Sequence, residues 1–251
     1  MTLNLISELK LKHKHLHFSL IDPASQSPDK AGLMAHTCEH YGSDAIMVGG
    51  STVHKREQVH ETVAHIKAKS KLPVILFPNG AEAVSSNADY IFFMELLNST
   101  DLRFRGGEQI KGAPLIKQFG LHTISMGYLV ISTSKNPTTV EKAAKLDKIG
   151  MGDIEKAIQY ALYAEMIGMS CVYFEAGSGA EHPVPTDMIA AVRRQVKFPI
   201  IVGGGIRTPE AALERVKAGA DVIVTGTLLE DNSKALEEMI KAIHQHGHKI
   251  L

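Results

Sequence analysis

Short apolar runs alternate with longer amphipathic stretches from one end of the chain to the other. The apolar runs are typical of strands buried on both faces, and the longer stretches repeat apolar residues every three to four positions, as helices do. This pattern predicts strands at residues 16–21, 45–48, 74–77, 90–93, 124–131, 171–174, 200–202 and 222–224. It predicts helices at residues 29–41, 56–70, 81–86, 107–119, 153–167, 186–196, 209–218 and 232–246.

Eight strands, each followed by a helix or a loop, indicate an α/β protein with a (β/α)8 TIM barrel, built as a single domain over residues 1–251. Residues 42–49 and 219–226 resemble each other, which supports this fold. In both, a helix ends at glycine and aspartate opens a strand that runs into a glycine turn. An open doubly wound sheet is the alternative. It would normally bind phosphate after its first strand, where Asp22-Pro23-Ala24 contains no glycine.

The middle of the chain is harder to interpret. Gly127 interrupts the fifth predicted strand, and Pro114 lies within the helix before it. Residues 132–152 are polar, and we expect a loop or lid with a short helix there. The next helix is clearer, because Asp153 is a suitable N-terminal cap and Gly168 a suitable stop.

The composition is that of an ordinary globular protein, with 44% apolar and 22% charged residues. Lysine plus arginine and aspartate plus glutamate both number 27, and this balance argues against nucleic acid as a partner. No stretch resembles a signal peptide or reaches the ~18 apolar residues of a membrane span. We expect a cytoplasmic protein, which a lipophilic substrate can still bring to a membrane surface.

Cysteines and histidines occupy distinctive positions. Cys38 and Cys171 lie in apolar segments, which predicts buried free thiols in a reducing compartment. The histidines gather near the two ends of the chain. Their spacing is compatible with metal ligands, but we expect solvated chain ends instead. These residues are His13, His15, His17, His244, His246 and His248.

Glycine-rich turns directly follow the last three predicted strands, at residues 176–180, 203–205 and 226–227. Such turns expose backbone N–H groups that an anion can approach closely. In a barrel the carboxyl ends of all strands share one face, where phosphate commonly binds after the last strands. We therefore expect a phosphate-bearing substrate. The alternative is that glycine only permits tight geometry in these turns.

Two carboxylates at strand ends complete the candidate site. Asp22 follows the first strand and is suited to hold Mg²⁺, with Ser51 adding an oxygen after the second strand. Glu175 lies inside a glycine turn, where we expect it to act as a base or to orient a hydroxyl. Tyr173 points to the same side of its strand and can donate a hydrogen bond to the substrate. Alternatively, Asp22 caps a turn or helix, and Glu175 caps a helix or forms a salt bridge.

The strand ends disfavour two other chemistries. No lysine ends a strand, since the nearest, Lys55, follows Ser51 by four residues, and this argues against a Schiff-base aldolase. Residues 177–179 lack the third glycine of a dinucleotide-binding fingerprint, and they follow the sixth strand rather than the first. The sequence therefore also disfavours a nicotinamide cofactor. The apolar residues 91–97 belong to the core and barrel wall, and some of them can line a groove for an apolar tail.

The strand-end motifs occur together, and in this order, in a known enzyme family. They are Leu20-Ile21-Asp22-Pro23, residues 44–51, 73–78, 92–94, 96–99, 126–128, 173–180, 201–207 and 224–227. From about residue 5 to 245 the chain resembles geranylgeranylglyceryl phosphate synthase, an archaeal ether-lipid prenyltransferase. The related bacterial heptaprenylglyceryl phosphate synthases are more distant, because they carry lysine where this chain has Leu20.

The resemblance implies transfer of a geranylgeranyl group from geranylgeranyl diphosphate to the C3 hydroxyl of sn-glycerol 1-phosphate, with Mg²⁺. Asp22 and Glu175 are then the catalytic residues. Asp22 and Ser51 hold the metal, and Glu175 orients or deprotonates the hydroxyl. A homo-oligomer is implied, because relatives form dimers or larger rings. The implied glycerol phosphate site is Tyr173, Phe174, Glu175, Ala176, Gly177, Ser178, Gly179, Gly204, Gly205, Gly226 and Thr227.

Several positions around the third to fifth strands depart from the family pattern. Asn79-Gly80 inverts the expected order, Glu95 replaces serine, and Ser-Thr-Ser at residues 132–134 replaces Glu-Pro-Gly. There is no tryptophan, although relatives carry one near the position of Phe104 or Arg105. The prenyl tail is expected in this region, so the preferred prenyl length stays open, as does the choice between a dimer and a larger ring.

Two other functions stay open. The chain can be another phosphosugar barrel enzyme of the isomerase or aldolase type, which would not need the pair of Asp22 and Ser51 or an apolar groove. It can also be a non-catalytic protein that binds a phosphate ligand.

Overall fold

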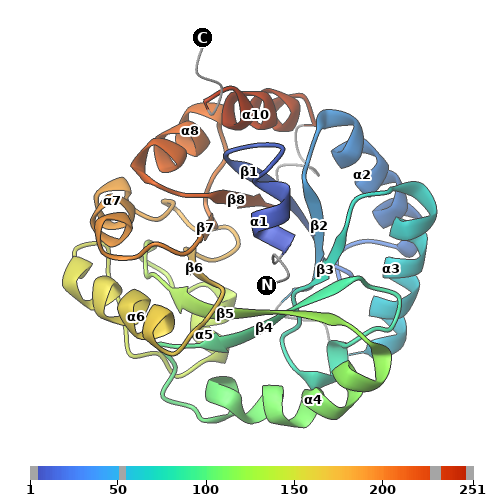
Figure 1. Ribbon diagram of the computed structural model, residues 1–251, viewed down its shortest axis with the longest axis horizontal. Helices are drawn as coiled ribbons and strands as arrows, with labels where there is room; N and C mark the ends of the chain where they lie inside the picture. The colour runs from blue at the N-terminus through green and yellow to red at the C-terminus, as the bar shows by residue number, and fades with distance from the viewer. Residues whose placement is uncertain (1–4, 51–54, 227–232, 247–251) are drawn as a thin grey trace.

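Eight parallel strands close into one barrel, in which each strand pairs with the next and β8 pairs with β1 (Figure 1). The computed structural model describes residues 5–50, 55–226 and 233–246. The predicted TIM barrel is therefore confirmed, and the open sheet is excluded. The strands are β1 (Leu16–Ile21), β2 (Ala45–Val48), β3 (Val74–Leu76), β4 (Tyr90–Leu96), β5 (His122–Val130), β6 (Cys171–Glu175), β7 (Ile200–Gly203) and β8 (Val222–Thr225).

Helices surround the barrel in Figure 1 and lie close to the predicted ranges. The α-helices are α1 (Leu5–Leu9), α2 (Pro28–Tyr41), α3 (Arg56–Lys69), α4 (Glu108–Phe119), α5 (Thr139–Ala143), α6 (Ile154–Met166), α7 (Thr186–Gln195), α8 (Pro209–Ala218) and α10 (Ser233–Gln245). Two shorter turns are η1 (Ala81–Ala83) and η2 (Arg103–Gly107). The helix predicted at 81–86 is thus only a 3-10 turn.

The core has an inner and an outer layer, because successive strand residues point to opposite faces. Inside the barrel, Phe18 and Met47 belong to one buried cluster. Ile21 belongs to the cluster between the strands and the helices. Helix α1, which the pattern did not predict, adds Leu5 and Ile6 to the inner cluster and covers one end of the barrel (Figure 1).

Gly127 lies within β5 without interrupting it. The strand pairs with β4 from His122 to Tyr128, straight through this residue. A side chain at position 127 would place its first carbon 2.7 Å from Leu97 and 3.0 Å from Ala164 of α6. Glycine is therefore needed for the close packing of α6 on the strand.

The segment of residues 132–152 contains one short helix, α5, as expected. Thr138 caps this helix in a reciprocal pair of hydrogen bonds with Glu141. The predicted capping role of Asp153 is wrong. Its carboxylate makes no cap hydrogen bond to α6 and instead accepts the backbone N–H of Gly150 at 2.7 Å. The carboxylate turns back toward the preceding loop, so it cannot reach the first turn of the helix.

Three aspartates that precede strands connect neighbouring repeats of the barrel in the same way. Asp44, Asp89 and Asp221 each accept, through Oδ2, a backbone N–H from the start of the previous strand. The donors are His17 at 2.8 Å, Val74 at 2.9 Å and Ile200 at 2.8 Å, respectively. The other carboxylate oxygen faces a basic side chain, which is His13, Lys67 and Lys10, respectively. The resemblance between residues 42–49 and 219–226 thus has a structural cause.

The expectation of solvated histidines at the chain ends is wrong for most of the described ones. His17 is fully buried between Ser43 and Thr225, and burial lowers its pKa to about 3, so the ring is neutral. His15 is buried as well, and His13 stacks on His244. These side chains are drawn in because the barrel closes β8 onto β1. His248 lies outside the described residues.

Cys38 and Cys171 are buried free thiols, as predicted. Burial raises the pKa of Cys38 to about 11, so its thiol is protonated at neutral pH. No helix in the described part of the chain is both long and apolar enough to span a membrane.

Candidate active site

A cavity opens at the carboxyl ends of the strands, where the predicted phosphate-binding turns converge. Most of the predicted site residues line it. These are Asp22, Tyr173, Glu175, Gly177, Ser178, Gly179, Gly204, Gly205 and Gly226. The two carboxylates, which are separated by most of the sequence, therefore face one space because the barrel brings its strand ends together.

Glu175 ends β6 and is buried at the base of this cavity. Its Oε1 accepts the backbone N–H of Gly177 at 2.6 Å, and the phenol of Tyr173 donates to the same carboxylate. Burial raises the pKa of Glu175, and these two hydrogen bonds only partly offset the effect. A fixed carboxylate with a raised pKa is suited to accept a proton from a substrate hydroxyl.

Four glycines in the turns after β6 and β7 adopt positive φ angles. They are Gly177 at 98°, Gly179 at 73°, Gly204 at 81° and Gly205 at 70°. At Gly204 an added side-chain carbon would lie 2.4 Å from Oε1 of Glu175 and 2.6 Å from the nitrogen of Gly177. The two turns therefore pack against each other without side chains. Such bare backbone can approach a phosphate closely.

Asp22 lines the same cavity and follows β1 directly. Its Oδ1 accepts the N–H of Ala24 at 2.8 Å, while Ser27 caps the following helix. Burial raises the pKa of Asp22, and hydrogen bonds from Ala24 and Ser25 partly offset this. An added side-chain carbon at Gly50 would lie 2.4 Å from its Oδ2. Among the described residues, no lysine or arginine forms a salt bridge with this carboxylate.

This environment fits a hard cation. A half-buried carboxylate that lacks a positive partner in the described structure is stabilised when a cation binds it. Mg²⁺ needs few protein ligands, because it keeps waters and takes further oxygens from phosphate groups. Ser51, the second predicted ligand, lies outside the described residues.

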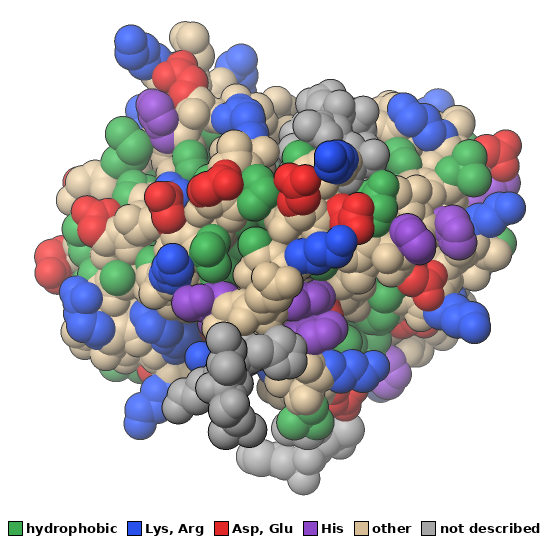
Figure 2. All heavy atoms as spheres, turned by 90° about the horizontal axis from the view of Figure 1, so that it is seen from above, with side chains coloured by type: hydrophobic (Ala, Val, Ile, Leu, Met, Phe, Trp, Pro, Cys, Tyr) green, Lys and Arg blue, Asp and Glu red, His purple; other side chains and the backbone are tan. Residues whose placement is uncertain are grey.

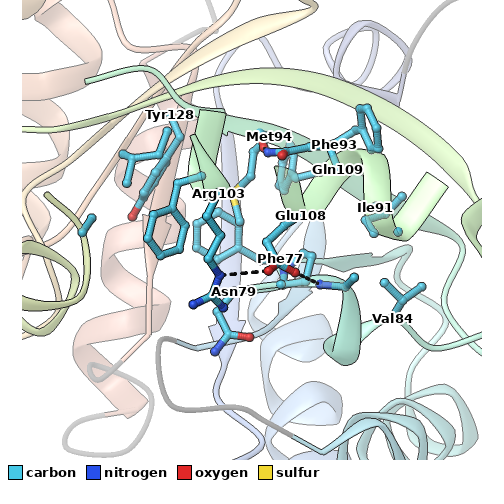
Figure 3. A pocket seen from close by; sticks show the side chains of 18 of the residues that line it. Phe77, Asn79, Val84, Ile91, Phe93, Met94, Arg103, Glu108, Gln109 and Tyr128 are labelled. Atoms are coloured by element: carbon cyan, nitrogen blue, oxygen red, sulfur yellow. Dashed lines mark hydrogen bonds and ion pairs between the residues drawn. The ribbon is translucent and has the colours of Figure 1, made fainter. Parts of the chain in front are cut away.

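An apolar cavity adjoins the polar one (Figure 3). Its walls come from the turn after β3 and from β4, η1, η2, α4 and α5. They include Val84, Ile91, Phe93, Met94 and Phe104. Arg103 and Glu108 form an ion pair at 2.9 Å at this cavity, and Glu108 also accepts the N–H of Ala81 at 2.8 Å.

The two cavities share four lining residues, Gly50, Phe77, Tyr128 and Val140. Phe77 stacks on Tyr173 with ring centroids 5.7 Å apart and meets Tyr128 edge-on at 5.5 Å. The aromatic rings thus stand between the apolar walls and the polar strand ends. This arrangement can hold a molecule with an apolar tail and a charged head.

Comparison with known proteins agrees with this geometry. The model of the PcrB family matches residues 9–247. The chain belongs to the PcrB family. It is 45% identical over 224 residues to geranylgeranylglyceryl phosphate synthase of Thermoplasma volcanium, covering 89% of this chain and 88% of that protein. It is 46% identical over 234 residues to the synthase of Pyrococcus horikoshii, covering 93% of this chain and 91% of that protein.

Solved structures give the same result. The wild-type synthase from Thermoplasma volcanium superposes with a TM-score of 0.92 at 40% identity, covering 98% of this chain and all of that one. The synthase from Thermoplasma acidophilum, in complex with its substrate sn-glycerol-1-phosphate, superposes with a TM-score of 0.91 at 39% identity. The superposition covers 97% of this chain and 100% of that one.

Two residues of the predicted site do not line the cavity of this PcrB-family chain. Phe174 points the other way along β6 and belongs to the outer core. Ala176 belongs to that core too, and its N–H already donates to the carbonyl of Gly203 at 3.0 Å. Thr227 lies outside the described residues. The alternation of a strand, applied residue by residue, would have separated Phe174 from Tyr173 and Glu175.

Sequence reasoning missed how residues 132–152 contribute to the site. A side chain at Gly177 would place its first carbon 2.6 Å from Thr138, so this segment packs on the glycine turn. Thr139 and Val140 line the polar cavity. Ser132 donates to Glu141 at 2.6 Å, and Ser134 accepts the N–H of Glu181 at 2.9 Å. The capping pair at Thr138 and Glu141 was the available signal for the helix, but no pattern predicts this packing.

Some of the departures from the family pattern lie at the apolar cavity, where Asn79 and Gly80 are lining residues. Phe104 lines its wall. Arg105 instead pairs with Glu95 at 3.9 Å and donates to the carbonyl of Leu97 at 2.7 Å. At Gly80 an added side-chain carbon would lie 2.9 Å from the carboxylate of Glu108, so a larger residue there would displace this side chain.

Proposed function

We propose that this protein transfers a geranylgeranyl group from geranylgeranyl diphosphate to the C3 hydroxyl of sn-glycerol 1-phosphate and releases diphosphate. The observation that carries the proposal is the junction of an apolar cavity with a glycine-lined polar one, at Phe77 and Tyr128. A prenyl tail fits the first cavity and the polar groups of both substrates fit the second. The named activity of the relatives supports the same reaction.

The glycerol phosphate lies against the turns after β6, β7 and β8. The phosphate is held by backbone groups of Gly177, Gly179, Gly204 and Gly205. Their positive φ angles favour glycine, so these positions carry no side chain. The substrate complex of the Thermoplasma acidophilum relative supports this ligand. Because backbone groups of the turns bind the phosphate, no lysine is needed beside Glu175 to neutralise it.

Glu175 handles the acceptor hydroxyl. The C3 oxygen forms a bond to the first carbon of the prenyl chain, while the bond between that carbon and the diphosphate oxygen breaks. The electron pair of the broken bond leaves with diphosphate. The hydroxyl proton passes to the Glu175 carboxylate, which Tyr173 and Gly177 hold in place.

Asp22 and Ser51 hold Mg²⁺ when it is bound. The ion supplies charge neutralisation for the diphosphate leaving group. Asp22 is suited to this task, because it lines the same cavity as the glycine turns and its side chain is only partly buried.

The protein is further proposed to act as a cytoplasmic homo-oligomer, with residues 1–251 forming one catalytic domain. Its partners are the two substrates, and the balanced charge disfavours nucleic acid. Two exposed apolar side chains support self-association. They are Met166, the last residue of α6, and Ile167, which follows it. Leu102, which precedes η2, and Ile110 of α4 are exposed next to elements of the apolar cavity, and they support peripheral contact with a membrane surface.

A phosphosugar isomerase or aldolase is the rival function. Such an enzyme needs the glycine turns but has no use for an apolar cavity joined to them. Lys55, the lysine nearest to a strand end at the candidate site, is exposed. These observations favour the prenyltransferase.

The test is an assay by mass spectrometry with geranylgeranyl diphosphate, a ladder of shorter and longer prenyl diphosphates, and both glycerol phosphate enantiomers. We expect a prenyl ether of sn-glycerol 1-phosphate that forms only with Mg²⁺ present. Asp22→Asn should abolish turnover more strongly than it weakens glycerol phosphate binding. No prenylated product at any chain length would refute the proposal, and full activity of D22N would refute the metal-binding role.

A further inference from the structure

A second group of metal-type ligands lies at the amino ends of the strands, away from the candidate active site. His13 precedes β1, Asp44 precedes β2, and His244 lies in the last turn of α10. Their ligand atoms are all within 4.8 Å of one another. Figure 2, which views the molecule from the side of α8, α10 and α2, shows several histidine side chains on this face.

Asp44 organises the cluster. Nδ1 of His13 lies 2.8 Å from its Oδ1, and Nε2 of His244 lies 2.9 Å from its Oδ2. The two rings are stacked with centroids 3.7 Å apart and an angle of 17° between their planes. Each imidazole therefore directs one ring nitrogen toward the same carboxylate.

The carboxylate is fixed before any ligand arrives. The side chain of Asp44 is only 5% exposed, and its Oδ2 also accepts the backbone N–H of His17 at 2.8 Å. His244 is 14% exposed and His13 is 34% exposed. The cluster is thus closed on the side of the barrel and accessible from solvent on the side of His13.

The corresponding aspartates elsewhere in the barrel carry different partners. Asp221 faces Lys10 and Arg193, and Asp89 faces Lys67. These cations compensate a carboxylate but offer no lone pair to a metal. Of these three aspartates, Asp44 is the one that faces imidazoles. Neutral imidazole is a good metal ligand. At Asp44 the same structural position can therefore bind a metal ion as well as link two strands.

We propose that His13, Asp44 and His244 bind one Zn²⁺ ion. Two imidazole nitrogens and one carboxylate oxygen are a ligand set that zinc accepts, and water completes the tetrahedron on the solvent side. Mg²⁺ is disfavoured, because it prefers an all-oxygen shell. The ion joins the segment before β1, the start of β2 and the end of α10, and thereby holds the first repeat of the barrel to its last helix.

The experiment uses untagged protein that has been treated with EDTA and dialysed. Zn²⁺ binding is measured by equilibrium dialysis with elemental analysis, in excess Mg²⁺ so that sites for hard cations are occupied. The double variant His13→Asn with His244→Asn keeps side-chain N–H donors toward Asp44 but removes both imidazole lone pairs. We expect the wild type to bind one more Zn²⁺ than this variant, and each single variant to bind it roughly tenfold more weakly or worse.

His40→Asn is the matched control, because it removes an exposed imidazole from the last turn of α2. It should bind as much Zn²⁺ as the wild type. Circular dichroism and the transferase rate show whether the variants are folded. If the double variant does not fold, the single variant H13N replaces it, because His13 is the more exposed of the two histidines. The proposed site would be refuted if H13N bound as much Zn²⁺ as the wild type, or if H40N lost as much Zn²⁺ as H13N does. His13 and His244 would then serve only as hydrogen-bond partners of Asp44.

Discussion

At the scale of single residues, Glu175 shows how position determines the chemistry of a side chain. A carboxylate at the end of β6 loses most of its contact with water when the chain folds around it. Burial then raises its pKa, although Tyr173 and Gly177 stabilise the charged form. The candidate site thus creates a better proton acceptor than an exposed glutamate would be.

Replacing Glu175 with glutamine should lower kcat by roughly 10²–10⁴-fold, because the proton acceptor is lost. A base works only when it is deprotonated, so the wild-type rate should fall as the pH drops through the raised pKa of Glu175. The acidic limb of the pH–rate profile should therefore lie above the ordinary glutamate value of 4.5. The E175Q profile should lack this limb. Steady-state kinetics across pH test this, and an unchanged limb in E175Q would refute the assignment to Glu175.

Gly204 and Gly120 separate backbone strain from loss of the site. Both have positive φ angles, 81° and 67°. At Gly120 nothing lies within 4 Å of an added side-chain carbon, whereas at Gly204 that carbon would lie 2.4 Å from Glu175. Gly120→Ala should cost about 1 kcal/mol of stability and leave kcat/KM unchanged. Gly204→Ala should cost more and reduce kcat/KM by roughly 100-fold or more.

Thermal unfolding and steady-state kinetics measure both effects. Equal behaviour of the two variants would mean that only the backbone angle matters at Gly204, and that the turn has no part in the site.

At the scale of elements, the barrel is held together at its amino end by aspartates that link successive strands. Asp221 is 12% exposed, faces both Lys10 and Arg193, and accepts the N–H of Ile200. Asp89 makes the corresponding bond to Val74, but it is 33% exposed and faces one lysine. The same geometry therefore occurs in a buried and in a more exposed version.

Asp221→Asn should lower the free energy of unfolding by about 2–3 kcal/mol, because two cations lose a largely buried partner. Asp89→Asn should cost about 1 kcal/mol or less, because water screens the exposed pair. Asparagine keeps an acceptor for the backbone N–H in both variants, so the comparison isolates the charge. Urea unfolding measures both values, and an equal cost would show that burial of the carboxylate does not govern the effect.

At the scale of the whole molecule, the apolar cavity is assembled from several successive elements, from the turn after β3 to α5. Gly112 of α4 faces Ala81 of η1, and an added side-chain carbon there would lie 3.6 Å away, in ordinary van der Waals contact. The width of the cavity therefore depends on how α4 packs beside η1 and β4. A large side chain on this helix should occupy the space that a prenyl tail needs.

Gly112→Phe should shift the preferred donor from geranylgeranyl to shorter prenyl diphosphates, with kcat/KM for the longer donor reduced by roughly 10-fold or more. Gly112→Ala is the control. It should keep the chain-length preference and stabilise α4 by up to about 1 kcal/mol. Competition between donors, read by mass spectrometry, tests both variants. An unchanged preference in G112F would mean that the tail does not lie in this cavity.

Much of this architecture could be predicted because it depends on local patterns. Apolar runs placed β1 and β2 at their observed limits, and Pro209 at a first helical turn placed α8. Glu175 and Asp22 could be predicted as site residues, because a parallel barrel sends every strand end to one face. The limits of β4 and β5 were less accurate, since partner strands determine where pairing stops.

Alone, the sequence determined the eightfold alternation, the buried strands and the residues at their carboxyl ends, because these follow from local hydrophobic periodicity. Only the tertiary structure decided what those residues meet. Closure of β8 onto β1 buried His17 and brought His244 beside His13. The packing of Thr138 on Gly177 made residues 132–152 a wall of the site, and α4 enclosed the apolar cavity. Such contacts join residues far apart in the chain, and they depend on how side chains fill space once the barrel is closed.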